Sequence, residues 1–171
     1  MTEVILVNER DEAIGTMEKM QAHREALLHR AFSVILRNSA GEILLQQRAF
    51  DKYHSGGLWT NTCCSHPAPG EDILAASKRR LIEELGIHCN DLKEVYHFIY
   101  KAELDNELTE HELDHVVVGT YDGEIIPNSE EVHTVAYVTS EELNRRITNE
   151  PEQFTVWFKA IYDKLHPEEL L

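Results

Sequence analysis

Several side chains in this sequence could bind a metal ion. Five imidazole or carboxylate groups lie where they could converge: His23, His29, His66, Glu110 and Glu112. Alternate residues of a strand share a face about 7 Å apart, so both glutamates could reach one ion while His111 points away. Three imidazoles and two carboxylates suit Mn²⁺, Zn²⁺, Fe²⁺ or Co²⁺, and so much nitrogen favours Mg²⁺ less. Taken alone, the Glu-His-Glu triplet is typical of an exposed strand end, so the whole combination supports the metal site.

The stretch from residue 59 to residue 87 combines a tandem cysteine, His66, a Pro/Gly loop and a helix with carboxylates. Apolar residues recur at helical spacing from Ile73, and Gly86 ends the run, so the pattern predicts a helix over 72–86. The other helix face carries two possible i,i+4 ion pairs, Arg79 with Glu83 and Arg80 with Glu84. Such pairs would stabilise a solvated helix by about 0.2–0.5 kcal/mol each, which is the structural alternative to a functional role.

The same helix matches most of the Nudix box, a metal-binding sequence signature. The matching residues are Glu71, Arg79, Leu81, Glu83, Glu84, Gly86 and Ile87. Two positions depart from it: Ser65 replaces the leading glycine, and Arg80 replaces the first glutamate of the helical trio. Nudix hydrolases use these helix carboxylates to hold divalent ions against a diphosphate, so a positive charge among them argues against hydrolysis.

The surrounding pattern predicts a mixed β-sheet covered by helices. Strands are expected at 4–7, 31–36, 43–47, 95–102, 110–121 and 131–139, with helical spacing from 17 to about 29, over 140–146 and from 151 to about 165. The turn at 38–41 would join 32–36 and 43–47 as an antiparallel hairpin. Strands and helices do not alternate strictly, so we expect an α+β fold, an α/β/α sandwich, in one domain over 1–171.

Composition limits the classes of function. A chain of 171 residues is long enough for one domain with a core. A formal net charge of −15 argues against nucleic acid or an anionic membrane as partner, so an anionic substrate would need a local basic pocket or a bound cation. The three cysteines form no disulfide framework, and no secretory signal or membrane-length apolar run is present. We therefore expect a cytoplasmic protein.

Four segments together carry a specific resemblance: AHREALLHRAFS, LWTNTCCSHP, the modified Nudix box and LTEHELDHVVVG. They resemble the type 1 isopentenyl-diphosphate Δ-isomerases of the Nudix superfamily, over about residues 4–165. That family also has an arginine where this chain has Arg80, so the departure supports the resemblance. The resemblance implies a Nudix-like fold that interconverts isopentenyl and dimethylallyl diphosphate in isoprenoid biosynthesis, as a monomer or a homodimer.

The resemblance also implies a role for individual residues. The five residues named above would hold a divalent metal, Mn²⁺, Mg²⁺ or Zn²⁺. Cys64 and Glu112 would be the catalytic pair, with Tyr100 hydrogen-bonded near Glu112 and Trp157 facing the reacting carbon. Three residues would bind the diphosphate: Arg48, Lys52 and Arg80. Glu84 and the backbone carbonyl of Cys64 would complete a Mg²⁺ site shared with the substrate.

The implied reaction adds one proton to an alkene and removes another, through a tertiary carbocation. Water must be excluded, and an indole face could stabilise the cation by about 2 kcal/mol. A thiol and a metal-bound carboxylate on opposite faces of the alkene can each hold or release a proton, and the sequence leaves their order open. Trp59 and Cys63 are assigned to the core. The alternatives are a Nudix diphosphohydrolase and a metal-binding module without catalysis.

Overall fold

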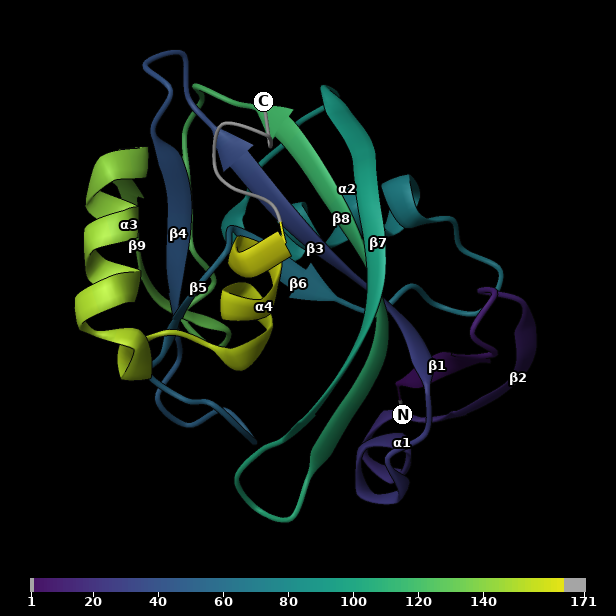
Figure 1. Cartoon of the computed structure of the whole chain (residues 1–171). Coiled ribbons are helices and arrows are strands. Elements are labelled where there is room, and N and C mark those ends of the chain that lie inside the picture. Colours follow the sequence, from purple (N-terminus) through teal and green to yellow (C-terminus); the bar gives the residue numbers. More distant parts are fainter. Residues whose placement is uncertain (1, 165–171) are drawn as a thin grey trace.

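The computed structural model describes residues 2–164, which form a nine-stranded mixed sheet with helices on both faces (Figure 1). No helix in this range is long and apolar enough to cross a membrane. The strands are β1 (Glu3–Val7), β2 (Ala13–Glu18), β3 (His29–Arg37), β4 (Ile43–Arg48), β5 (Trp59–Thr60), β6 (Cys63–Ser65), β7 (Leu92–Glu103), β8 (Thr109–Thr120) and β9 (Val132–Val138). The helices are α1 (Lys19–Glu25), α2 (Ile73–Leu85), α3 (Ser140–Asn149), the 3₁₀ turn η1 (Pro151–Gln153) and α4 (Val156–Lys164).

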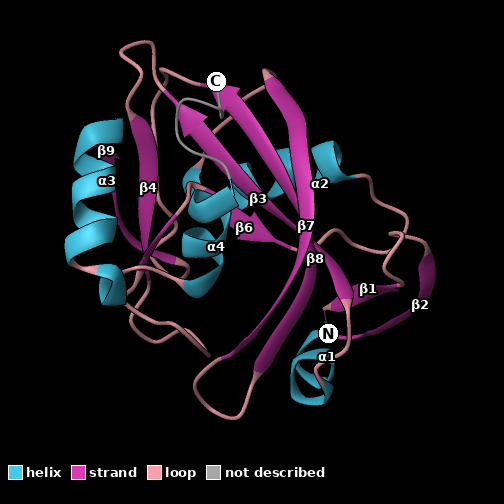
Figure 2. Ribbon diagram, in the orientation of Figure 1, coloured by secondary structure: helices cyan, strands magenta, loops and turns pink. Residues whose placement is uncertain are grey.

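Two apolar cores lie on opposite faces of the sheet. On one face, Ile35 of β3 and Val116 of β8 pack with Phe158 of α4. On the other face, Val34 and Val117 pack with Leu81 of α2. Neighbouring residues of each strand thus enter different cores, as the alternation of a strand requires. Figure 2 shows α4 in front of the sheet and α2 behind it, so the predicted α/β/α arrangement is confirmed.

Strand β3 lies at the centre of the sheet, and its pairing differs from the predicted hairpin. It runs parallel to β8 over its whole length, from His29↔Glu112 to Arg37↔Thr120. The short strand β6 pairs with its other edge, and β4 meets it only at Arg37↔Ile43. The predicted antiparallel pairing of 32–36 with 43–47 is therefore wrong. Only the turn and the adjacent pair Arg37↔Ile43 form. The reason is tertiary, because β6 occupies the edge that β4 would have used, while β4 pairs with β5 and β9.

Helix α2 begins and ends where the sequence predicts. The Asp72 side chain accepts a hydrogen bond from the Ala75 N–H, which caps the N-terminus. Gly86 adopts a left-handed conformation with φ 62°, and the N–H of Ile87 donates to the carbonyl of Leu81. This pattern of hydrogen bonds is a Schellman motif, which favours glycine at that position. Helix α2 therefore has a fixed start and end, and its carboxylates have fixed positions.

Two other predicted helices differ from the structure in their boundaries. Helical spacing over 17–29 yields only α1, because β2 extends to Glu18 and Ala26 ends the helix in the left-handed conformation. The helix predicted from Pro151 is divided into η1 and α4 by extended backbone at Phe154, whose neighbour Thr155 donates its backbone N–H to the carbonyl of Trp59. Its predicted end, at about residue 165, lies outside the described residues.

Candidate metal centre and active site

One cavity of about 510 Å³ opens between the sheet and the loops that precede α2. Residues with acid–base, metal-binding or aromatic side chains line part of it: Cys64, His66, Glu110, Glu112 and Trp157. Basic residues line another part: Lys19, Arg48, Lys52, Arg79 and Arg80. Six glutamates also line the cavity, so an anion could bind only at the part where these five cations lie.

Four of the five predicted metal ligands form one compact group. Ligand atoms of His23, His29, His66 and Glu112 lie within 4.8 Å of one another. The fifth, Glu110, belongs to an overlapping group with His23 and His54. The parallel register that sets His29 beside Glu112 brings these distant segments together. His111 points away, as expected, and its Nδ1 lies 3.1 Å from the carbonyl of Ala26.

The histidines in this group are oriented as metal ligands. Nδ1 of His23 lies 2.7 Å from the carbonyl of Lys19, and Nδ1 of His29 lies 2.8 Å from that of Leu27. Each Nδ1–H can donate to its carbonyl, which directs Nε2 into the group, where Nε2 of His29 lies 3.1 Å from Glu112 Oε2. The Nε2 atom of His23 is buried without a hydrogen-bond partner. Burial lowers the pKa of His23, and that of His66 to about 4, so both imidazoles are neutral, as metal ligation requires. These residues fit a divalent cation.

The two glutamates share a buried polar cluster with Tyr100. The Tyr100 hydroxyl lies 2.6 Å from Glu112 Oε1 and 2.8 Å from Glu110 Oε2. Burial raises the pKa of Glu110 well above its usual value, and the negative charge of Glu112 adds to this. Tyr100 itself is not among the residues that line the cavity. Its hydroxyl therefore contacts the Glu112 carboxylate from outside the cavity.

Cys64 and Glu112 face the same cavity in opposite protonation states. Burial raises the pKa of the Cys64 thiol far above its usual value, and nearby carboxylates add to this, so the sulfur keeps its proton. Burial alone would also raise the pKa of Glu112. Hydrogen bonds with His29 and His66 outweigh this effect and hold the Glu112 pKa well below its usual value. Environments that push two pKa values apart are what an acid and a base in one cavity require.

Trp157 lies on α4, and its side chain lines the cavity and also belongs to the apolar core between α4 and the sheet. Its side chain is buried, and the Arg48 guanidinium lies 5.1 Å from its ring centroid. The ring of His54 meets it edge-on, with the centroids 5.7 Å apart. Trp59 does not line the cavity but packs against the core cluster, as predicted. Of the two tryptophans, only Trp157 is placed to contact a ligand in the cavity.

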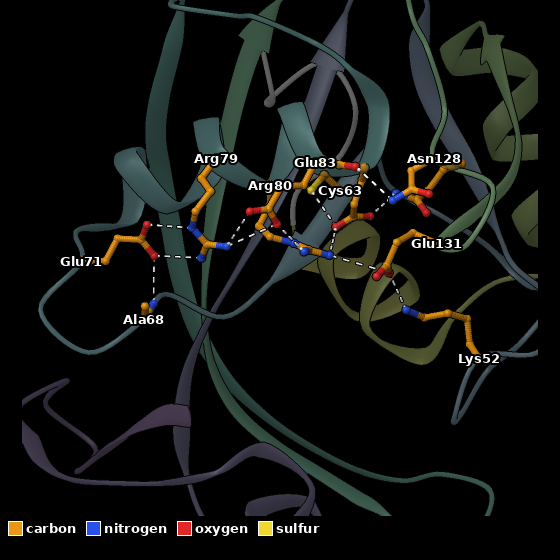
Figure 3. A network of polar contacts seen from close by, with 11 residues as sticks. Lys52, Cys63, Ala68, Glu71, Arg79, Arg80, Glu83, Asn128 and Glu131 are labelled. Carbon is orange, nitrogen blue, oxygen red and sulfur yellow. Dashed lines mark hydrogen bonds and ion pairs between the residues drawn. The ribbon is translucent and has the colours of Figure 1, made fainter. Parts of the chain in front are cut away.

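Carboxylates hold the basic part of the cavity in place (Figure 3). Lys52 Nζ lies 2.6 Å from Glu131, and Arg80 pairs with Glu83 at 2.6 Å and with Glu84 at 2.9 Å. Glu84 is only 5% exposed and also accepts a hydrogen bond from Gln46, so the Arg80–Glu84 pair is not a solvated surface pair. Cys63 is fully buried, as predicted, and its thiol lies 3.4 Å from Glu84.

Comparison with known proteins places this geometry in a family. Residues 27–158 match the NUDIX domain model. The isopentenyl-diphosphate Delta-isomerase of Pectobacterium atrosepticum is 49% identical over 96% of this chain and 92% of the relative. That of Photobacterium profundum is 50% identical over 93% of this chain and 91% of the relative. The chain belongs to the isopentenyl-diphosphate Delta-isomerase family.

Solved structures share the fold of this isomerase family member at lower identity. A Deinococcus radiodurans protein matches with a TM-score of 0.72 at 22% identity, over 86% of this chain and 90% of that chain. A MutT protein from Methanosarcina mazei matches with a TM-score of 0.65 at 17% identity, over 80% of this chain and 91% of that chain. At these identities the likeness concerns the fold alone, and it agrees with the predicted Nudix fold.

Sequence reasoning missed several residues that line the cavity of this isomerase family member: Lys19, Tyr53, His54 and Glu131. Lys19 and His23 are four residues apart on α1, and this i,i+4 spacing was the available signal for Lys19. His54 is buried, its Nε2 makes no hydrogen bond, and burial with the charge of Arg48 lowers its pKa to about 3. The others have no local sequence signal, because their position depends on where loops fold.

Proposed function

We propose that this protein interconverts isopentenyl diphosphate and dimethylallyl diphosphate in isoprenoid biosynthesis, the activity for which its family is named. The observation that carries the proposal is the shared cavity, which Cys64, Glu112 and Trp157 line together with a group of cations. Nudix hydrolases hold divalent ions with a trio of helix carboxylates, and this chain has Arg80 in place of the first of the three. Here Arg80 pairs with both Glu83 and Glu84, which supports an isomerase over a diphosphohydrolase.

The proposed chemistry uses a proton donor and a proton acceptor on the two sides of one alkene. The Cys64 thiol holds a proton and can deliver it to the terminal carbon of isopentenyl diphosphate, which leaves a thiolate. The charged Glu112 carboxylate can then remove a proton from the allylic carbon, and Tyr100 keeps that carboxylate in position. The intermediate is a tertiary carbocation, which the face of Trp157 can stabilise without forming a bond to it. After the product leaves, the thiolate regains a proton and Glu112 loses one, so the starting state returns.

The histidine and glutamate cluster would hold the metal through four or five ligands: His23, His29, His66, Glu110 and Glu112. A bound Mn²⁺, Mg²⁺ or Zn²⁺ would fix the Glu112 carboxylate and lower its affinity for a proton. At the basic end, Arg48, Lys52 and Arg80 would bind the diphosphate. Glu84 and the backbone carbonyl of Cys64 would share a Mg²⁺ ion with it. The cytoplasmic location, the monomeric or dimeric state and the absence of nucleic-acid and membrane partners stay predictions.

Proton exchange tests the proposed reaction directly. Isopentenyl diphosphate incubated with the protein in D₂O should take up deuterium and yield dimethylallyl diphosphate with the diphosphate intact, as followed by NMR. Release of phosphate from this substrate or from nucleoside diphosphates would instead support a hydrolase. Binding without deuterium uptake would indicate a module that lacks catalysis. Either result would overturn the proposed function.

Removal of divalent metal should inactivate the protein. Without a cation the imidazoles of His23, His29 and His66 lose their common partner, and Glu112 is no longer held in place. We expect chelated protein to lose isomerisation and to regain it when Mn²⁺ or Mg²⁺ is added, with elemental analysis of each sample. Full activity in a sample without detectable divalent metal would contradict the metal site.

Loss of the Arg80 charge should weaken substrate binding. Hydrogen bonds between charged groups are worth about 1.5–3 kcal/mol, so Arg80→Gln should raise KM about ten- to a hundredfold. Because Arg80 is proposed to contact the diphosphate and not the reacting carbons, kcat should change less than KM. Lys78→Gln is the matched control, since Lys78 is an exposed cation on the same helix. Equal KM values for the two variants would remove Arg80 from the diphosphate site.

A further inference from the structure

A second group of metal-binding side chains lies on the opposite face of β8 from Glu110 and Glu112. The alternation of the strand directs His115 to the side where Leu113 packs against Ile5 and Val7 of β1. There His115 meets Glu94 and His97 of β7, and ligand atoms of the three residues lie within 4.8 Å of one another. None of the three lines the cavity described above.

A β-bulge in β7 creates this group. His97 lies directly across from His115, whereas Glu94 pairs with Val117 and the register then shifts before Tyr96. Residues three apart in a regular strand point to opposite faces. Glu94 and His97 therefore share a face only because the bulge adds one residue between them. Bulges often re-aim a side chain at a functional position. Here the bulge brings a carboxylate to a pair of facing imidazoles.

The His115 ring is held between two carboxylates. Its side chain is 8% exposed, and its Nδ1 contacts Glu94. Asp11 Oδ2 lies 3.0 Å from the other nitrogen, Nε2, without hydrogen-bond geometry. Asp11 is fixed in turn by Arg30, which donates to its side chain and to its backbone carbonyl at 2.7 Å. A carboxylate beside the distal nitrogen is the usual outer partner of a metal-binding histidine.

We propose that Glu94, His97 and His115 form a second divalent-metal site, suited to Zn²⁺, with a fourth position open to solvent. Two imidazoles and one carboxylate are ligands that zinc accepts in tetrahedral geometry. Ligand atoms that share one zinc ion are roughly 3.5 Å apart, so small side-chain rotations suffice. Glu94 and His97 are exposed, so their side chains have room for these rotations.

Metal binding at this site would stabilise the segment that leads to the first metal centre. Asp11 belongs to the turn between β1 and β2, and β2 leads directly into α1, which carries Lys19 and His23. A cation bound to His115 on Nδ1 would strengthen the contact between Nε2 and Asp11, because the ring proton then lies on Nε2. The hairpin of β1 and β2 would thereby be fixed to β7 and β8.

Counting metal ions tests the proposal. Protein purified with its resident metal is dialysed against buffered Zn²⁺, and total metal per chain is measured for wild type, His97→Ala and Glu94→Gln. Both variants should hold one equivalent fewer than wild type. In ring-nitrogen NMR, Zn²⁺ should shift the resonances of His97 and His115 in wild type. The two substitutions act independently, and both remove exposed side chains, so loss of folding is not expected to obscure the result.

His88→Ala serves as the control, since His88 is an exposed histidine outside both clusters. It should keep the full metal content and the Zn²⁺-dependent shifts of His97 and His115. If wild type and the two variants take up equal amounts of metal, Glu94 and His115 form an ion pair only, and the proposed site does not exist. The same conclusion follows if Zn²⁺ leaves both histidine resonances unchanged.

Discussion

Cys64→Ser should reduce isomerisation by about 10²–10⁴-fold, the range expected when a general acid or base is removed. A serine hydroxyl has nearly the same shape as the thiol but is a much weaker acid, so it donates its proton far less readily. The strand pairing of β6 with β3 does not depend on this side chain, so the fold should persist. Steady-state kcat from the NMR assay, with circular dichroism to verify folding, measures the effect.

Cys89→Ser is the control for this substitution. Cys89 is a buried thiol that does not line the cavity, and its sulfur lies near the carbonyls of Asp91 and Thr120. Its replacement should leave kcat unchanged. Near wild-type turnover in Cys64→Ser would show that the proton passes through another group, and the acid and base assignment would have to be abandoned.

Glu112→Gln should also reduce kcat by about 10²–10⁴-fold. The amide cannot accept the allylic proton, and it is a poorer metal ligand than the carboxylate that His29 and His66 now contact at 3.1 and 2.8 Å. Two effects therefore combine, and elemental analysis separates them. We expect reduced metal content together with the loss of turnover, and excess Mn²⁺ should restore metal content without restoring kcat.

Glu103→Gln provides the matched control for Glu112→Gln, because Glu103 is an exposed glutamate at the end of β7. It should retain both metal and activity. Recovery of wild-type kcat in metal-saturated Glu112→Gln would mean that Glu112 only binds the ion. The base would then have to be sought among the other carboxylates that line the cavity, beginning with Glu110.

Local patterns predicted the elements that carry their own signals. Asp72 and Gly86 fix the ends of α2 through caps that involve only neighbouring residues. The alternation of β8 correctly separated His111 from Glu112, because side-chain direction in a strand depends only on parity. The periodicity around His23 overestimated α1, since the chain up to Glu18 pairs with β1 instead. Strand pairing between separate segments outweighs a weak helical propensity.

The sequence by itself determined which residues could do chemistry: the histidines, the paired glutamates, the tandem cysteine and the arginine within the helix carboxylates. Only the tertiary structure decided which of them meet. The parallel pairing of β3 with β8 sets His29 beside Glu112, and the positions of α1 and of the segment after β4 bring Lys19 and His54 to the same cavity. A bulge that no local pattern marks aligns Glu94 with His97. Residue type and spacing are local properties, whereas register and loop position come from packing between segments distant in sequence.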